Sequence, residues 1–150
     1  MFDHILTMLT GEPPADRPAD IQIAVGALLV EAARMDDRFE AAERAAIRRI
    51  LARRFSLSPA ETERLLAASE QAAAASSQLF RFTQLVVERF GPQERIGLIE
   101  MMWEVAYADG VLDPDEDALL RRVAGLIYVP DQDRGAARKR VLQRLGRTPE

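Results

Sequence analysis

The sequence predicts an all-α protein: a single-domain bundle of about seven or eight helices. Three observations favour this fold class. Apolar residues recur at helical spacing along most of the chain, Pro and Gly separate the helical stretches, and no run alternates apolar and polar residues over the length of a strand. With 150 residues, of which 48% are hydrophobic and 29% charged, the chain is long enough to bury one core.

The composition excludes several classes of function. The chain has no Cys and a single His, His4, so thiol nucleophiles, Cys-ligated metals and multi-His sites have almost nothing to be built from. The formal net charge of −4 argues against nucleic-acid binding. No apolar run reaches the roughly 18 residues that span a bilayer, and the first ten residues lack the basic start of a secretory signal. We therefore expect a cytoplasmic protein that meets a membrane surface only peripherally, if at all.

Residues 1–18 are expected to form a short helix and a Pro-rich linker ahead of the main domain at 19–150. Within residues 2–9 the apolar side chains share one side of a helix: Phe2, Ile5, Leu6 and Leu9. The prolines that follow, through residue 18, cannot occupy a helix interior. The helix is therefore expected to end before them.

The first part of the main domain contains three expected helices. The first spans about residues 19–35 and is apolar nearly all the way round, which is typical of a helix at the centre of a fold. The second spans about residues 41–54. Ser58, Pro59 and Glu61 then form a helix start signal, because Ser can cap, Pro fits the first position and Glu can bond back to the cap. The third helix runs from there to about residue 75.

A connecting helix and three further helices are expected in the second part. The connecting helix covers about residues 78–90; Ser77 can cap it, and Gly91 suits the position just past its end. Pro92 opens the next helix, and a second Asp-Pro-Asp-Glu start signal lies at residues 113–116. The expected spans are 92–108, 114–128 and 132–145.

The sequence also pairs with itself when shifted by 73 residues. The matched pairs include Ile23 with Ile96, Glu31 with Glu104, Ala33 with Ala106, Asp36 with Asp109, Glu43 with Glu116 and Arg48 with Arg121. The acidic matches fall at one register inside matching helix–turn–helix patterns. We therefore predict two three-helix repeats, about 19–75 and 92–145, related by a pseudo-twofold axis.

The repeat predicts two equivalent ion pairs. Antiparallel helices joined by a short turn would place Glu31 opposite Arg48 or its neighbour, and Glu104 opposite Arg121 or its neighbour. Both carboxylates lie in the most apolar helices of the chain, where an unpaired buried charge is very costly. Our hypothesis is that these structural ion pairs brace the two helical hairpins.

An acidic turn is the first candidate functional site. Six acids and no base lie between residues 104 and 117: Glu104, Asp109, Asp113, Asp115, Glu116 and Asp117. Clustered carboxylates suit a hard cation such as Ca²⁺, although the spacing does not follow the EF-hand pattern. The hypothetical metal ligands, brought together by the twofold, are Asp36, Glu43, Asp109, Asp113 and Glu116. The alternative is that these acids only cap the following helices and complement their dipoles.

Two further groups of residues have both a structural and a functional interpretation. Residues 134–147 carry six bases and no acid: Arg134, Arg138, Lys139, Arg140, Arg144 and Arg147. They are either the solvated face of a last helix or a surface for an acidic partner, an anionic membrane or nucleic acid. Pairing with the acidic turn, in the same molecule or the next, is a further alternative. An aromatic and methionine group is either core or a groove for a partner helix. Its members are Phe80, Phe82, Phe90, Met101, Met102, Trp103 and Tyr107.

Two segments resemble a known family signature. They are LLVEAARMDDRFEAAERAAI (28–47) and MMWEVAYADGVLDPDEDALL (101–120), and both resemble TerB-like domains, named for tellurite resistance protein B. The signature is a small-residue helix that ends in Ala-Asp-Gly, an apolar residue two positions on, and a Glu that starts the next helix. The second segment matches it well, whereas the first has Met35-Asp36-Asp37 in place of Ala-Asp-Gly. The resemblance covers about residues 20–135 and implies a bundle of about seven helices with an acidic patch suspected of binding divalent metal.

The sequence as a whole predicts a cytoplasmic, TerB-like binding or adaptor domain without enzymatic activity. It would act on a protein partner, or on a divalent cation such as Ca²⁺ at the acidic corners, in a stress- or tellurite-related setting. The alternative is a metal-dependent hydrolytic enzyme that uses the same carboxylates. Nothing in the sequence marks a phosphate-binding loop or a nucleophile elbow.

Overall fold

The computed structural model describes residues 19–34, 41–75, 79–108, 110 and 114–146. These residues form seven helices and no strand, so the all-α prediction is confirmed for them. The helices are α2 (Asp20–Ala33), α3 (Ala41–Phe55), α4 (Pro59–Ala75), α5 (Leu79–Arg89), α6 (Pro92–Ala106), α7 (Pro114–Leu126) and α8 (Asp131–Arg144). The expected helix at 2–9, its Pro-rich linker and the expected cap Ser77 lie outside the described residues.

Helix α2 is the centre of the bundle, as its apolar composition predicted. Nine of its residues are buried, among them Leu28, Leu29 and Val30, which have no exposed surface. It packs against α3, α4, α5, α6 and α7. Its approach to α4 is close, because a Cβ added at Gly26 would lie 1.9 Å from the Ser69 hydroxyl oxygen. Glycine at this position lets the two helices meet.

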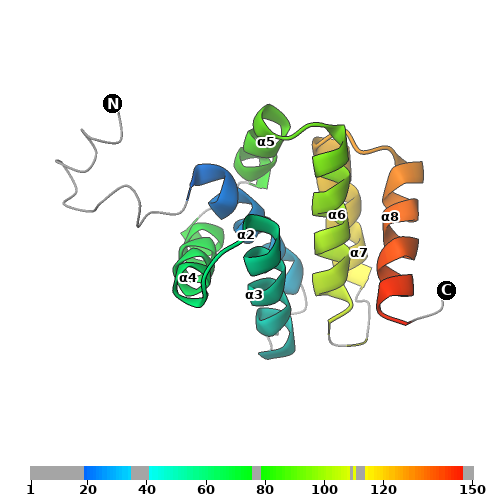
Figure 1. Cartoon of the computed structure of the whole chain (residues 1–150). Coiled ribbons are helices and arrows are strands. Elements are labelled where there is room, and N and C mark those ends of the chain that lie inside the picture. The colour runs from blue at the N-terminus through cyan, green and yellow to red at the C-terminus, as the bar shows by residue number, and fades with distance from the viewer. Residues whose placement is uncertain (1–18, 35–40, 76–78, 109, 111–113, 147–150) are drawn as a thin grey trace.

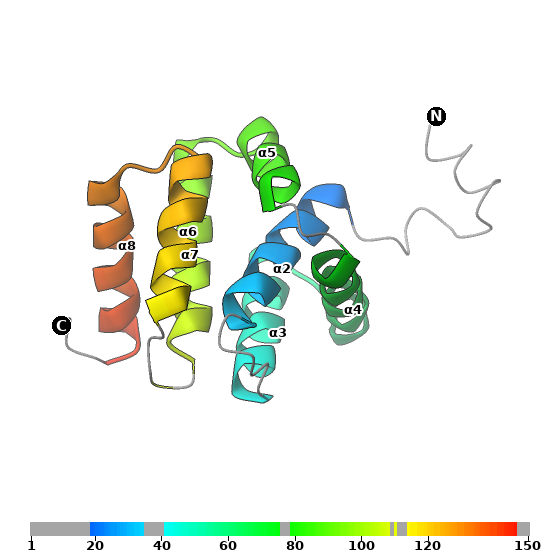
Figure 2. The same cartoon turned by 180° about the vertical axis from the view of Figure 1, so that it is seen from behind.

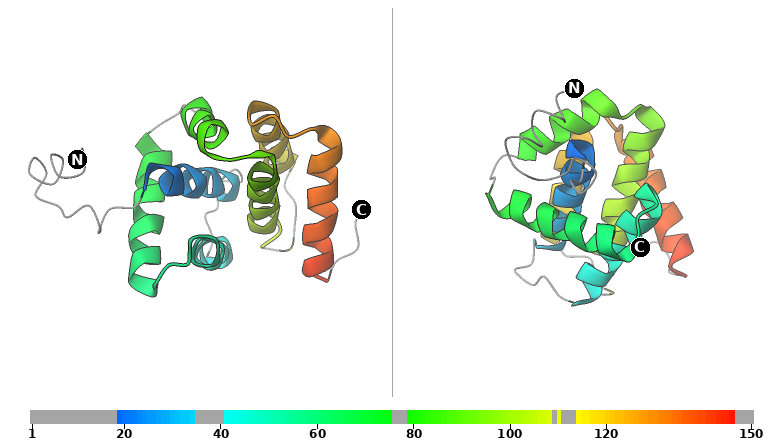
Figure 3. Two further views of the ribbon diagram at one scale, coloured as in Figure 1. Left: turned by 45° about the horizontal axis from the view of Figure 1, so that its top comes forward. Right: turned by 60° about the vertical axis from the view of Figure 1, so that its left-hand side comes forward.

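Helix α6 lies between α3 and α8 (Figure 1). Helix α7 packs behind α6 in that view and lies in front of it in the view from behind (Figure 2). Helices α4 and α5 cover the part of α2 that lies away from α8 (Figure 3, left). Helix α6 is buried over much of its length, including Trp103 and Met102. Its two flanks therefore meet α3 from the first half of the chain and α8 from the end of the second.

The predicted start signal of α4 is confirmed, and the prediction for Gly91 needs correction. The backbone N–H of Glu61 donates to Ser58 Oγ (3.2 Å), and the N–H of Ser58 donates to Glu61 Oε1 (2.9 Å). Gly91 does not end α5 in a left-handed conformation. It has φ −77° and is the N-cap of α6, where its N–H donates to Glu94 Oε1 at 3.2 Å. Phe90 lies between the end of α5 and Gly91, and its N–H donates to Val86 O at 2.8 Å, so Phe90 is the residue that ends α5.

The aromatic and methionine group is core, with one exception. Phe82, Phe90, Met101, Met102, Trp103 and Tyr107 are all buried. Phe80 is 61% exposed on α5 and does not belong to this core. Helices α2–α4 and α6–α8 provide the two sets of three helices that the repeat requires. The twofold relation between them stays a prediction.

Candidate functional site

The most enclosed charge on the α3–α6–α8 face is the Glu104 carboxylate of α6, whose side chain is only 7% exposed. Arg53 of α3 and Arg144 of α8 each place an Nη2 atom 3.5 Å from its Oε1. The Nη2 atom of Arg49 lies 3.7 Å from Oε2. Guanidinium groups from both neighbouring helices therefore converge on one buried carboxylate.

These residues belong to three parallel rows of charge. Residues four apart lie on the same side of a helix, which aligns Arg49 with Arg53, Glu100 with Glu104 and Arg140 with Arg144. The acidic row on α6 lies between the two basic rows. Arg144 Nη1 is 2.6 Å from Glu100 Oε1, and Arg140 Nη2 is 3.4 Å from Glu100 Oε2. We call these six residues the arginine–glutamate cluster.

The short contact between Arg144 and Glu100 has a clear electrostatic effect. The hydrogen bond that Arg144 donates to Glu100 raises the pKa of the guanidinium, and the charges of Glu100 and Glu104 add to it. Arg144, which like any arginine is charged at physiological pH, links the two acids of α6. This fixes the end of α8 against α6.

A pocket of about 460 Å³ opens beside the cluster. Ile50 and Met101 supply its apolar lining, and Arg53, Arg54 and Arg144 supply positive charge. Gly97 also lines it, and a Cβ added there would meet no atom within 4 Å. The carboxylates of Glu100 and Glu104 line it as well, so three guanidinium groups face two carboxylates, and the lining keeps a surplus of positive charge suited to an anionic group attached to an apolar stem.

The predicted hairpin ion pairs are wrong in their partners. Arg48 pairs with Glu63 of α4 through a 2.6 Å contact, and Arg121 pairs with Asp117 one turn earlier on α7 at 3.5 Å. Glu104 does receive arginine partners, but from α3 and α8 instead of α7. The reason is the position of α6 between these two helices, which antiparallel pairing within one hairpin could not reveal.

Glu31 of α2 is half-buried, and the structure gives it no pair with Arg48. Burial raises the pKa of its carboxyl group above the ordinary value of 4.5, and the neighbouring Arg34 acts in the opposite direction. The two positions related by the repeat thus have different surroundings. Glu104 meets three guanidinium groups, whereas Glu31 is chiefly desolvated.

The predicted metal ligands are only partly within the described residues. Glu43 and Glu116 lie in the first turns of α3 and α7, and each is only 3% exposed. Asp36, Asp109 and Asp113 lie outside the described residues. Among the residues that the structure describes, no three His, Cys, Asp or Glu side chains are grouped so as to hold a metal ion. The metal site therefore stays a prediction.

Comparison with known families identifies the domain. The model of the family described as "Tellurite resistance protein TerB" matches residues 22–139. The chain belongs to the TerB family. No curated protein and no solved structure matches the chain. The TerB match begins in α2 and ends within α8, so Arg140 and Arg144 of the cluster follow directly after the matched region.

Sequence reasoning missed Arg49, Arg53 and Glu100 as site residues of this TerB domain. The signal that could have revealed them is the spacing of four in each helix, which puts like charges in a row. A row of like charges along a buried helix such as α6 calls for opposite charges on its neighbours.

In the part of the TerB domain that the structure describes, no helix is long and apolar enough to cross a membrane.

Proposed function

We propose that this TerB-family chain is a non-enzymatic binding domain that takes an acidic segment of a protein partner on its α3–α6–α8 face. The observation that carries the proposal is the convergence of Arg49, Arg53 and Arg144 on the buried Glu104. These arginines lie on two different helices, so an occupant of the face would contact both.

The arginines retain capacity for a further anion. Their side chains are 58%, 62% and 48% exposed for Arg49, Arg53 and Arg144. Each guanidinium offers five N–H donors. Their contacts with Glu104 are 3.5–3.7 Å, longer than the roughly 2.7–2.9 Å of a charge-assisted hydrogen bond. An incoming carboxylate can therefore be bound by donors that Glu104 does not use fully.

The charge of this face opposes the charge of the whole chain. The ion pairs among α3, α6 and α8 join five bases, Arg49, Arg53, Arg54, Arg140 and Arg144, to three acids, Glu94, Glu100 and Glu104. Bases therefore exceed acids here, although the full chain carries a formal net charge of −4. Complementary potential accelerates encounter and selects among partners, so an acidic partner segment would be directed to this face.

A titration with a glutamate-rich peptide tests the proposal. Amide chemical shifts of ¹⁵N-labelled protein should change along α3, α6 and the end of α8, and the changes should weaken at higher salt. The double variant Arg53→Gln/Arg144→Gln should lose these changes. Arg48→Gln is the matched control, because Arg48 lies on the same helix α3 but pairs with Glu63 of α4.

Two outcomes would argue against the proposal. One is shift changes that spread evenly over the surface, since these would indicate non-specific attraction. The other is equal weakening by Arg48→Gln and by the double variant. A phosphate titration run in parallel distinguishes recognition of a carboxylate-bearing peptide from general anion binding.

Binding of a divalent cation at the acidic corners is the second candidate function. It is supported by the burial of two carboxylates, Glu43 and Glu116, in helix first turns at positions 73 residues apart. Calorimetric titration with Ca²⁺, Mg²⁺ and Zn²⁺ tests it. Heat that disappears in Glu116→Gln but persists in Asp131→Asn, an exposed acid in the first turn of α8, would support it. No heat at millimolar ion would remove it.

The alternative of a metal-dependent hydrolase that uses the same carboxylates is tested in the same samples. Hydrolysis of ester and phosphoester substrates that requires the cation and Glu116 would favour an enzyme over a binding domain. We further propose a cytoplasmic location and a role in tellurite resistance. A location-reporting fusion and growth of a deletion strain on tellurite check these two points.

A further inference from the structure

The pocket beside the arginine–glutamate cluster is open where α6 carries a glycine. Gly97 lies inside α6 and lines this pocket, and a Cβ added there would meet no atom within 4 Å. Glycine inside a helix is destabilising relative to alanine. At Gly26 the missing side chain lets α4 approach, but no neighbour among the described residues makes such use of Gly97. The space above Gly97 is therefore available to a side chain of a partner.

The side of α6 that carries Gly97 is apolar in its middle and charged toward both ends. Glu94, Gly97, Met101 and Glu104 follow one another at spacings of three and four, so they share one side of the helix. Met101 is 7% exposed and lines the pocket together with Gly97. An occupant that lies along α6 therefore meets an apolar stretch between two charged ends.

Arg54 of α3 supplies a guanidinium at the end nearer the start of α6. Its Nη2 atom lies 3.2 Å from Glu94 Oε2, and its guanidinium carbon lies 5.5 Å and 5.4 Å from the ring centroids of Phe55 and Phe90. Cation–π contacts and the ion pair hold this side chain in one place. A side chain that is already held loses less conformational freedom on binding, so Arg54 is a preformed contact for an acid.

Arg53 and Arg144 supply guanidinium groups at the other end, where both approach Glu104. Glu94 and Glu104 are ten residues apart, which corresponds to about 15 Å along a helix. An extended segment rises about 3.3 Å per residue. A segment with acids roughly two or three residues on either side of a central apolar residue therefore has the length to reach both ends.

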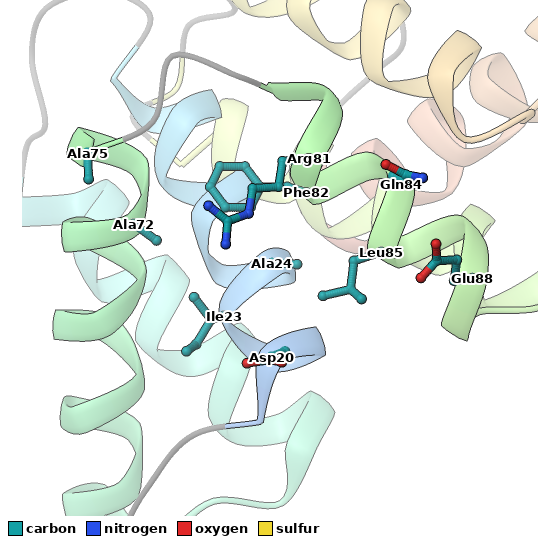
Figure 4. A pocket seen from close by; sticks show the side chains of 10 residues that line it. All are labelled: Asp20, Ile23, Ala24, Ala72, Ala75, Arg81, Phe82, Gln84, Leu85 and Glu88. Carbon is teal, nitrogen blue, oxygen red and sulfur yellow. The ribbon is translucent and has the colours of Figure 1, made fainter. Parts of the chain in front are cut away.

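The pocket between α2, α4 and α5 differs in its charge (Figure 4). Its volume is about 540 Å³, and Ile23 and Leu85 contribute to its apolar lining. Asp20 and Glu88 bring two carboxylates to this lining and Arg81 brings one guanidinium (Figure 4). Three guanidinium groups face two carboxylates in the α3–α6–α8 pocket. Complementary charge therefore directs an acidic segment to the α3–α6–α8 pocket.

We propose that the α3–α6–α8 pocket takes one bulky apolar side chain, of the size of leucine, from a partner segment with acids on both sides of it. The apolar side chain occupies the space above Gly97 and contacts Met101. The acids reach Arg54 on one side and Arg53 and Arg144 on the other. This inference rests on the function proposed above and adds its specificity, because the apolar side chain selects among acidic segments.

Two peptides test the proposal on the full chain. One is rich in glutamate with a single central leucine, and the other carries serine in place of that leucine. The leucine peptide should bind about tenfold more tightly, a smaller gain than complete burial of a leucine gives, because the pocket is open on one side. Isothermal titration calorimetry measures both affinities.

Gly97→Leu fills the pocket from within and should make the two peptides bind equally. Gly125→Leu is the matched control and should keep the tenfold difference. Gly125 is an exposed position in α7, outside this pocket, and a Cβ added there also meets no atom within 4 Å. Leucine favours a helix more than glycine does, so both variants are expected to fold.

Methyl signals of the methionines report where the leucine binds. In protein labelled with ¹³C at the methionine methyl groups, the Met101 signal should shift with the leucine peptide and not with the serine peptide. Met102, the next residue of α6, is fully buried, and its signal should stay in place with both. Amide signals of α5 at the other pocket, such as that of Leu85, should also stay in place.

The results separate this inference from the function on which it rests. Equal affinity of the two peptides would overturn the inference and leave an acidic-segment binding domain. An advantage of leucine that survives Gly97→Leu would also overturn it, because the apolar contact would then lie elsewhere. So would a leucine peptide with acids on one side only that binds as tightly as the original. If neither peptide bound, the proposed function would fail and this inference with it.

Discussion

Replacing Glu104 by Gln tests the arginine–glutamate cluster most directly. Gln keeps the volume and an acceptor oxygen, so the change removes mainly the charge that faces Arg49, Arg53 and Arg144. At 3.5 Å, Coulomb attraction is about 1 kcal/mol in water and about 5 kcal/mol at an effective dielectric constant of 20. The three guanidinium groups are about half exposed, so values near the lower limit apply, and measured exposed pairs contribute roughly 0.2–1 kcal/mol each. The substitution also removes the free-energy cost of burying the Glu104 charge, which offsets part of the lost attraction. We expect a net loss of about 1–2 kcal/mol.

Urea denaturation followed by far-ultraviolet circular dichroism measures this loss. The midpoint should fall while the slope stays the same, because the surface exposed on unfolding does not change. Glu63→Gln is the matched control, because Glu63 pairs with a single arginine at 2.6 Å and its side chain is 56% exposed. It should cost well under about 1 kcal/mol.

The reasoning is refuted if Glu104→Gln is as stable as the parent, or if Glu63→Gln costs as much. Either result would mean that convergence of three guanidinium groups gives Glu104 no more stabilisation than a surface pair. The same variant should bind the glutamate-rich peptide more tightly than the parent, because it removes the internal competitor for the arginines.

Three further changes probe other parts of the bundle. Gly26→Ala should lower the free energy of unfolding, measured by chemical denaturation, by about 1–3 kcal/mol, because its Cβ would lie 1.9 Å from Ser69 Oγ. Ser69→Gly in the same chain should restore part of this loss. If the effects of the two substitutions on the free energy of unfolding simply add, this contact is contradicted. Ser58→Ala should cost about 1 kcal/mol through loss of the α4 cap, measured in the same way. Glu31→Gln should melt at a higher temperature than the parent at pH 7, because burial raises the pKa of Glu31 above 4.5 and disfavours its charged form. Stability from this group is present below pH 4.5 and lost as the pH rises through the raised pKa, so the gap in melting temperature should close on acidification; a gap that is the same at pH 7 and pH 4 would be inconsistent with it.

The helices and their order could be predicted from the sequence because both depend on local chemistry. The start of α4 follows from Ser58 and Glu61, which bond to one another within a single turn. The central place of α2 follows from its apolar surface, which no exposed helix could carry. Gly91 shows the limit of such reasoning: the signal for a boundary was correct, but whether it ended α5 or began α6 depended on how tightly the two helices connect.

The site residues divide in the same way. That Glu104 needs a cationic partner follows from a charge in an apolar helix, and the structure supplies three. Which arginines would serve did not follow, because sequence spacing constrains neighbours within one hairpin and is silent on helices far apart in the chain. Arg53 and Arg144 lie 91 residues apart yet approach the same oxygen, Glu104 Oε1.

The sequence by itself determined that this chain is helical, where most of its helices begin, which helix is central and which family signature it carries. Each of these follows from the periodicity or capping of neighbouring residues, whose interactions are fixed by chain connectivity. The tertiary structure alone decided that α6 lies between α3 and α8, and hence that two rows of arginine meet one row of glutamate. That choice depends on packing the whole apolar surface at once, and no local interaction encodes it.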